Sequence, residues 1–241
     1  MSIALRSVGW REPALQCVLC DARRKGICGA LDDDQLATFD RASHRVVLES
    51  GAELVGDAER FDHFAILLSG VVKLTKTLSD GRQQIVGLQF APDFLGRPFR
   101  SESNLNAEAA TEISVCIVPK PAFERMMLES PELERRLYRQ ALDELDQARD
   151  WMVALGRKTA SEKIASFLLM IARCVQPAAG QASTSFDLPL TRADIADFLG
   201  LTIETVSRQL TRLRRDKIIA MTGTRRITVP NLARLEARAG N

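Results

Sequence analysis

Four cysteines in this sequence could supply the sulfur ligands of a metal centre. Cys17, Cys20 and Cys28 lie within one twelve-residue stretch, CVLCDARRKGIC, and Cys116 lies far along the chain in ISVCIV. Four thiolates can close a tetrahedral zinc site or ligate a 4Fe-4S iron-sulfur cluster. Structural zinc sites usually bring two close pairs of ligands. Three local cysteines and one distant cysteine therefore favour the iron-sulfur cluster, and zinc stays open as the alternative.

Other uses of the cysteines are less well supported. The charged residues of DARRK lie between the first three and predict a surface segment rather than buried, unligated thiols. A redox enzyme using Cys17 and Cys20 is a candidate of a different class, but no thioredoxin-like βαβ pattern surrounds that pair. We therefore expect no enzymatic activity. The fifth cysteine, Cys174, lies in an apolar helical segment that predicts a packed thiol.

The composition predicts a folded protein of the cytoplasm. Of 241 residues, 46% are hydrophobic and 27% charged, a mixture typical of globular chains. No apolar run approaches the roughly 20 residues that a bilayer span needs. The segment Met1 to Trp10 lacks the basic start and apolar stretch of a secretory signal. We expect no membrane association, and a cytoplasmic location would keep the thiols reduced.

Charge is distributed unevenly along the chain. Residues 157–241 carry 14 Lys and Arg against 7 Asp and Glu, a net charge of +7, whereas residues 1–156 carry 19 against 24, a net charge of −5. A compact basic domain is typical of proteins that neutralise the phosphates of double-stranded DNA. The C-terminal third is therefore the candidate nucleic-acid-binding part.

Short strands are expected between Arg45 and Val118. The segments 46–55, 64–78, 83–90 and 113–118 are rich in β-branched residues and alternate apolar with polar side chains. Glycines separate them, and Asp80-Gly81 between two such runs is a strong hairpin signal. The pattern predicts an antiparallel barrel or roll.

A long helix should follow. Ser130-Pro131-Glu132 supplies a cap residue, a proline at the first helical position and an early acidic residue, and Gly156 interrupts the helix. A stripe at spacings of three and four is typical of a two-stranded coiled coil; it consists of Tyr138, Ala141, Leu145, Ala148, Met152 and Leu155. The stripe either joins two subunits or packs on the chain's own β-domain. Its alanines and acidic neighbours predict weak association in a homodimer.

The segment from Leu190 to Ile219 has the layout of a helix-turn-helix. Thr191 with Asp194 forms a cap for a first helix, Gly200 permits a tight turn, and Thr202 caps a second helix. Ile195, Ala196 and Leu199 form the apolar face of the first helix, and Val206, Leu210 and Leu213 that of the second. A second helix placed in this way enters the major groove of DNA.

The outward side chains of the second helix have the chemistry to recognise bases. Arg208 can donate two hydrogen bonds to guanine, Glu204 can accept one from cytosine, and Ser207 can bond either way. The expected DNA-binding residues are Thr191, Thr202, Glu204, Ser207, Arg208, Thr211 and Arg212. Arg212, Arg214, Arg215 and Lys217 suit phosphate contacts, which make affinity depend steeply on salt.

At these residues the chain resembles the CRP/FNR family of bacterial transcription regulators. TRADIADFLGLTIETVSRQL is similar to the family's helix-turn-helix signature, and MTGTRRITVPN to its wing. The resemblance implies an α+β fold with an N-terminal antiparallel, jelly-roll-like β-roll, a long dimerisation helix and a C-terminal winged helix-turn-helix. We expect a cysteine-rich segment at 1–29, the β-roll at 30–128, the dimerisation helix at 129–157 and the DNA-binding domain at 158–241.

Within the family, the chain resembles the oxygen-responsive FNR branch of the FnrN and FnrL type. That resemblance implies a 4Fe-4S cluster on Cys17, Cys20, Cys28 and Cys116, and Cys174 has no counterpart in that motif. It also implies palindromic DNA sites with half-sites similar to TTGAT, read by Glu204, Ser207 and Arg208. The hairpin tip Ser79-Asp80-Gly81-Arg82 becomes a candidate surface for RNA polymerase.

The resemblance to the nucleotide-sensing branch is weaker. Members of that branch follow the glycine of FAPDFLG with an acidic residue and later carry an Arg-Ser or Arg-Thr pair, whereas this chain has Arg97 and no such pair. We therefore expect no cyclic nucleotide. The predicted function is an oxygen-responsive activator of anaerobic or microaerobic genes. The alternative is a regulator of the same family that holds zinc, or depends on no cluster, and does not sense oxygen.

Overall fold

The computed structural model describes residues 17, 20, 22–98, 100–175 and 184–240. The chain divides into two compact units, residues 1–146 and 147–241. The division falls inside the long helix α4 (Pro131–Arg157). The predicted interruption at Gly156 is wrong, since α4 continues through Gly156 to Arg157. The last turns of α4 belong to the second unit because Trp151 packs edge-on against Phe198, with ring centroids 4.6 Å apart. No helix among the described residues is long and apolar enough to cross a membrane.

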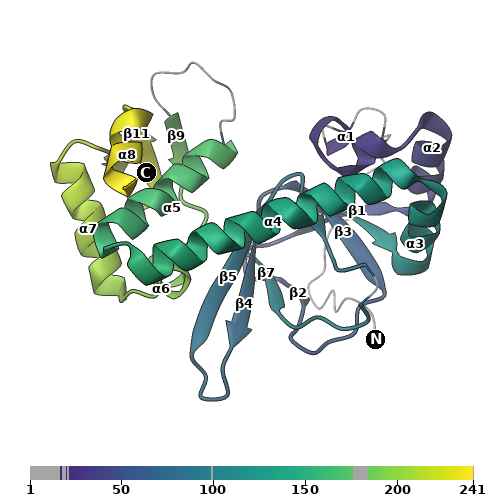
Figure 1. Cartoon of the computed structure of the whole chain (residues 1–241), viewed down its shortest axis with the longest axis horizontal. Coiled ribbons are helices and arrows are strands. Elements are labelled where there is room, and N and C mark those ends of the chain that lie inside the picture. Colours follow the sequence, from purple (N-terminus) through teal and green to yellow (C-terminus); the bar gives the residue numbers. More distant parts are fainter. Residues whose placement is uncertain (1–16, 18–19, 21, 99, 176–183, 241) are drawn as a thin grey trace. The chain divides into compact units, whose positions relative to one another are not determined.

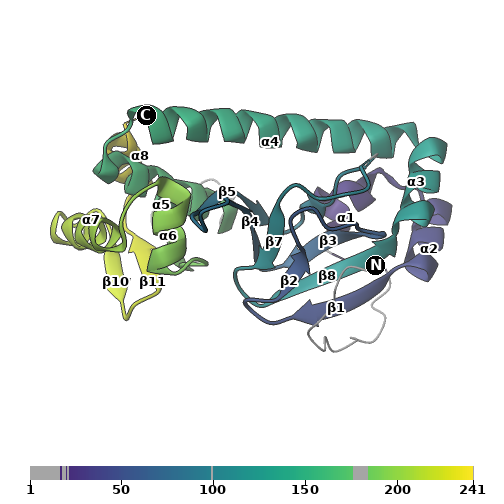
Figure 2. The ribbon, with the colours of Figure 1, turned by 90° about the horizontal axis from the view of Figure 1, so that it is seen from below.

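The first unit contains the predicted antiparallel roll. Its strands form two four-stranded sheets, ordered β1-β8-β3-β6 and β2-β7-β4-β5 (Figure 2). The strands are β1 (His44–Leu48), β2 (Glu53–Val55), β3 (His63–Ser69), β4 (Val71–Thr77), β5 (Gln83–Phe90), β6 (Phe94–Leu95), β7 (Asn106–Ala109) and β8 (Ile113–Pro119). Strands β6 and β7 were not predicted, because they are short and β7 (NAEA) has almost no β-branched residues.

The predicted hairpin joins β4 to β5. The amide of Leu78 donates to the carbonyl of Arg82, and Gly81 adopts a φ of +87° that favours glycine. The Asp80 carboxylate accepts hydrogen bonds from the backbone amide and the guanidinium of Arg82. These bonds fix the tip, so the hairpin has a defined shape.

Short helices cover one end of the roll (Figure 1). They are α1 (Ala22–Lys25), η2 (Ile27–Ala30), α2 (Asp33–Ala42) and α3 (Lys120–Glu129). A capping box between Asp32 and Gln35 starts α2. All four helices contribute to a core that also contains buried residues of β3, β6 and β8 and the first turns of α4. The cysteine-rich segment is therefore part of the packing of the first unit.

Helix α4 docks on the roll through polar contacts as well as apolar ones. The side-chain amide of Gln140 bonds both backbone groups of Phe94: its oxygen accepts from the amide at 3.2 Å, and its nitrogen donates to the carbonyl at 3.1 Å. Next to this contact, the Asp93 carboxylate accepts a hydrogen bond from the Phe90 amide at 2.9 Å. The turn before β6 is thus tied to the helix.

The second unit is the predicted winged helix-turn-helix. It contains α5 (Ala160–Val175), α6 (Arg192–Leu199), α7 (Ile203–Arg215) and α8 (Leu232–Ala239). Its sheet, of order β10-β11-β9, consists of β9 (Thr184–Asp187), β10 (Ala220–Thr222) and β11 (Arg226–Val229). A capping box between Thr159 and Glu162 starts α5. The hairpin of β10 and β11 is the predicted wing.

Asp93→Asn is expected to stabilise the first unit above pH 6. Burial, and to a smaller extent nearby Glu144, raises the pKa of the Asp93 carboxyl to about 6. The folded protein therefore binds more protons than the unfolded chain between about pH 4 and pH 6, and stability falls as the pH rises through that window. Asparagine can still accept the hydrogen bond from the Phe90 amide and carries no charge.

Urea unfolding followed by circular dichroism measures this effect. We expect Asp93→Asn to raise the free energy of unfolding by about 2 kcal/mol at pH 8 and by almost nothing near pH 4. Asp143→Asn is the matched control, because Asp143 is an exposed carboxylate of α4. Equal changes in the free energy of unfolding of Asp93→Asn and Asp143→Asn would contradict the raised pKa of Asp93.

Candidate functional site

Three parts of the chain place the four predicted cysteine ligands in or against one core. Among the described residues, however, no three Cys, His, Asp or Glu side chains are grouped closely enough to hold one metal ion. The backbone amide of Cys20 donates to the carbonyl of Cys17 at 3.2 Å, Cys28 lies in η2, and Cys116 lies in β8. Cys28 and Cys116 belong to the same buried core, and the half-buried Cys17 and Cys20 pack against it. The structure therefore gathers residues that are separated by up to 99 positions in the chain.

The four thiols lie within electrostatic reach of one another. Burial raises the pKa of Cys28 to about 12, with contributions from the neighbouring Cys116 and Cys20. The pKa of Cys17 is raised first by burial, then by the Asp40 carboxylate, and also by Cys116 and Cys28. Burial likewise raises the pKa of Cys116. Four thiolates in this pocket would repel each other strongly unless a cationic centre joined them.

The cysteine segment is more buried than the sequence predicted. Arg24 and Lys25 are exposed, but Ala22, Ile27 and Cys28 are buried. The charged residues of DARRK therefore do not keep the whole segment at the surface, because the short helices α1 and η2 separate the two kinds of side chain onto opposite faces. Cys174 also differs from its prediction, since it is exposed near the end of α5 rather than packed.

Aromatic rings occupy the same core as the cysteines. Phe94 stacks on Phe123 with ring centroids 4.8 Å apart, and Phe64 contacts both rings at 5.3 and 5.2 Å. Phe64 and Phe123 are fully buried. The thiols therefore face an apolar, low-dielectric core on this side, in which a bound group would be shielded from water.

The core of the cysteine segment continues into α4. Leu133 is fully buried in it, and Leu137 packs against it. The guanidinium of Arg136 donates to the backbone carbonyl of Lys25 at 2.6 Å. One face of the long helix thus rests directly on the segment between Cys20 and Cys28.

The predicted dimer stripe lies on a different face of α4. Tyr138, Leu145 and Met152 are exposed by 65%, 45% and 73%. Ala141 and Ala148 are also exposed, and only Leu155 is partly covered. The stripe does not pack on the roll, so that alternative is wrong. Two further exposed apolar residues, Leu142 and Val153, widen this surface.

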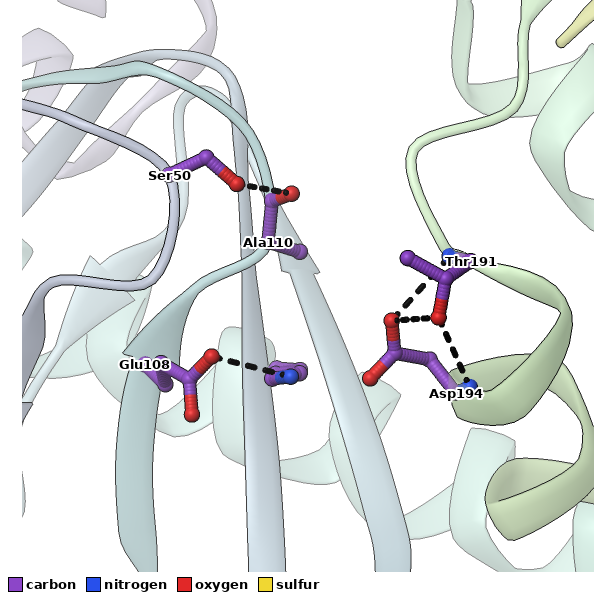
Figure 3. Close-up of polar contacts among 6 residues, drawn as sticks. Ser50, Glu108, Ala110, Thr191 and Asp194 are labelled. Atoms are coloured by element: carbon purple, nitrogen blue, oxygen red, sulfur yellow. Dashed lines mark hydrogen bonds and ion pairs between the residues drawn. The ribbon is translucent and has the colours of Figure 1, made fainter.

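Local hydrogen bonds build the helix-turn-helix as predicted. Thr191 and Asp194 form a reciprocal capping box at the start of α6 (Figure 3). Gly200 adopts a φ of +60° in the turn, and the Thr202 hydroxyl accepts a hydrogen bond from the Thr205 amide at the start of α7. The predicted apolar faces are buried, including Ile195, Leu199, Val206, Leu210 and Leu213.

The predicted base-reading residues are on the open face of α7. Glu204, Ser207 and Arg208 are exposed, as are Thr211 and Arg212. The pKa of Glu204 lies below its usual value because its own backbone amide and the Thr202 hydroxyl donate to its carboxylate, which is therefore charged. The Arg208 guanidinium rests 3.3 Å from the Thr205 hydroxyl. This face presents one anionic acceptor and several cationic donors.

Several supporting residues could not be found from the sequence. Arg234 donates to the carbonyls of Asp216 and Lys217 at the end of α7, and Arg238 pairs with the Asp216 carboxylate at 2.6 Å. Arg45 donates to the sulfur of Cys20 at 3.3 Å. No local spacing marks these contacts; only the fold brings the partners together.

The roll also encloses a cavity of about 130 Å³. Most of its lining is apolar, including Leu54, Leu74 and Leu95. Its charged lining residues include Arg97, which is exposed, and Glu144. A phosphate placed here would meet a carboxylate as well as a guanidinium.

Comparison with protein families identifies both units. Residues 162–238 match the Crp-like helix-turn-helix domain, and residues 45–130 match the cyclic nucleotide-binding domain. The second match describes the roll, whose fold serves members of the family with different ligands.

Individual relatives agree with these matches. The chain is 53% identical to a "Probable transcriptional activator" of Rhizobium leguminosarum bv. viciae over 91% of each chain. It is 41% identical to the transcriptional activator protein FnrL of Cereibacter sphaeroides, over 94% of this chain and 92% of FnrL. It is also 42% identical to the nitrogen fixation regulation protein FixK of Bradyrhizobium diazoefficiens, over 85% of this chain and 86% of FixK.

Solved structures place the fold in the same family. The structure of FixK2 from Bradyrhizobium japonicum superposes with a TM-score of 0.73 at 34% identity, covering 81% of this chain and 96% of FixK2. The fold, the capped recognition helix and the relatives lead to one conclusion. The chain belongs to the CRP/FNR family of transcription regulators, in its FNR and FixK group, and is a DNA-binding transcriptional activator rather than an enzyme.

Proposed function

We propose that this activator senses oxygen through a 4Fe-4S cluster held by Cys17, Cys20, Cys28 and Cys116. With the cluster bound, it would bind palindromic TTGAT-like sites as a homodimer and activate anaerobic or microaerobic genes. The observation that carries the proposal is the convergence of four thiols, from three elements, in a core that continues into α4. When bound, the cluster would supply an oxygen-reactive centre in that core.

Within the described residues, the thiols form no complete site for a single metal ion. The four sulfurs influence one another electrostatically, yet among the described residues no three Cys, His, Asp or Glu side chains are grouped closely enough to hold one metal ion. A four-iron cluster fills a wider space between its sulfurs than one zinc ion, which bonds each sulfur at about 2.3 Å. The cluster is therefore proposed from the number and positions of the four cysteines, with zinc as the alternative.

The similarity to FnrL extends over the cysteine segment. The similarity covers 94% of the chain, so the part left out is shorter than the 16 residues that precede Cys17. It therefore includes the segment with the first three cysteines. The similarity to FixK covers 85%, and the part left out is long enough to contain that whole segment. FnrL is thus the better guide to the N-terminal part.

A cyclic nucleotide is not part of the proposal. The family's nucleotide binders hold ribose and phosphate with residues that this sequence lacks after FAPDFLG. In the roll cavity, the Glu144 carboxylate lies among the lining residues together with Arg97, and both side chains are exposed. Signalling from the cysteine core needs no occupant in this cavity.

Contacts on α4 explain how the cysteine core could control dimerisation. Arg136 and Leu133 fix the first turns of the helix against the segment between Cys20 and Cys28. Release of that segment would break these interactions and alter how α4 presents its exposed stripe. Because two of the six predicted stripe residues are alanine, association would be marginal, as a switch requires.

The hairpin between β4 and β5 is the proposed contact for RNA polymerase. Its tip is fixed by the Asp80 and Arg82 bonds. Leu78 and Val86, near the tip, are exposed by 49% and 44%. Exposed apolar side chains on a defined turn are suited to contact another protein.

Anaerobic purification is the first test of the proposed function. We expect a brown protein with about four iron and four sulfide per chain that bleaches in air. Cys28→Ser should lose the cluster, whereas Cys174→Ser should keep it, because Cys174 lies outside the site. A colourless protein holding one zinc per chain would establish the zinc alternative and leave DNA binding intact.

The roles of the recognition-helix residues predict two kinds of binding defect. Arg208→Ala should lose about 1–3 kcal/mol of binding free energy on the TTGAT palindrome and almost none on a site whose guanine is replaced. Arg215→Ala should weaken binding to both sites equally and lower the salt slope by about 0.9, the value expected for one neutralised phosphate. Fluorescence anisotropy with labelled DNA at several salt concentrations distinguishes the two kinds of binding defect. Equal losses on both sites for Arg208→Ala would refute base recognition.

A charge in the exposed stripe should prevent dimerisation. Leu145→Glu is expected to raise the dimer dissociation constant of the cluster-loaded protein at least about tenfold, because each subunit would bury a carboxylate. Gln147→Glu adds the same charge at an exposed position outside the stripe and serves as the control. Sedimentation equilibrium under nitrogen measures both. A dimer unaffected by Leu145→Glu would place the interface elsewhere.

A further inference from the structure

Arg45 lies between two of the four thiols. Its guanidinium donates a hydrogen bond to the sulfur of Cys20 at 3.3 Å. In the antiparallel pairing of β1 with β8, Arg45 lies directly opposite Cys116. The half-buried Arg45 thus bonds the N-terminal cysteine segment from the strand position that pairs with the cysteine of the roll.

The charges around the thiols oppose each other. The Asp40 carboxylate accepts a hydrogen bond from the backbone amide of Cys17 at 3.3 Å, and its negative charge disfavours nearby thiolates. The positive charge of Arg45 acts on Cys116 in the opposite sense. Arginine suits this position because its guanidinium stays charged and offers several donors in a fixed plane.

We propose that Arg45 is a positioning residue that holds Cys20 against the roll and offsets the negative charge of the ligated cluster. Hydrogen bonds to ligand sulfurs, together with local charge, set how readily iron-sulfur centres react. Arg45 therefore slows cluster loss in air and sets the oxygen threshold of the regulator. This inference rests on the proposed cluster and adds a residue that is not a ligand.

The contact is specific to Arg45 among nearby arginines. Arg23 follows Cys20 closely in the sequence, yet its guanidinium pairs with Asp33 at 2.8 Å. Arg41, at the end of α2, donates to the Thr38 hydroxyl. Removing either charge should leave the Cys20 sulfur bonded as before.

The test compares Arg45→Ala and Arg45→Lys with Arg23→Ala as the matched control. Each full-length protein is reconstituted with iron and sulfide under nitrogen, and iron per chain, the bleaching rate in air-saturated buffer and the reduction potential are measured. We expect Arg45→Ala to bleach about tenfold faster than the original chain. Arg45→Lys should be intermediate, since it keeps the charge, and Arg23→Ala should be unchanged.

The outcomes separate this inference from the proposed function. If the original chain takes up no cluster, both the function and the inference fail. If it takes up a cluster and Arg45→Ala bleaches at the same rate and potential, only the inference fails. Thermal unfolding of the cluster-free protein shows whether Arg45→Ala folds. If it does not fold, Arg45→Gln is used in its place. The inference then requires that Arg45→Gln bleaches faster than Arg45→Lys, and equal bleaching rates in these two variants would overturn it.

Discussion

The packing of four thiols in or against one apolar core is the constraint on which the rest of the first unit depends. Neutral thiols are tolerated there, as the raised pKa values of Cys17, Cys28 and Cys116 indicate. Thiolates are not, unless a cationic centre joins them. A bound cationic centre would convert the thiols to thiolates. Its binding free energy would then stabilise the packing of α1, η2 and β8, and its loss would weaken that packing.

In the proposed function, helix α4 both contacts the cysteine core and joins two subunits, and these two tasks require opposite properties. The face with Leu133, Arg136 and Gln140 makes close contacts with the cysteine segment and the roll. The face with Tyr138, Leu145 and Met152 is exposed, and Ala141 and Ala148 lie between these larger side chains. The first face transmits a change at the cysteines only if it packs well. The second responds to that change only if its association is marginal, because a switch needs states of nearly equal free energy.

The sequence predicted most accurately the features that are built from local contacts. Capping at Thr191 and Thr202, the glycine turn at Gly200 and the buried periodicity of α7 each involve residues a few positions apart. The position of Arg45 opposite Cys116 depends instead on the register of β1 with β8. No pattern of nearby residues in the sequence predicts that register. Likewise, the contact of Gln140 with Phe94, next to the partly buried Asp93, joins residues 46 positions apart, and the missed strand β7 owes its place to its neighbours rather than to its composition.

The continuity of α4 offers a physical route between the sensing and DNA-binding parts. Its first turns belong to the core that contains the cysteines. Its last turns belong to the second unit, where Trp151 packs on Phe198 of α6, the helix that supports the recognition helix. The chain therefore passes from the cysteine core to the winged helix-turn-helix through one continuous helix, α4.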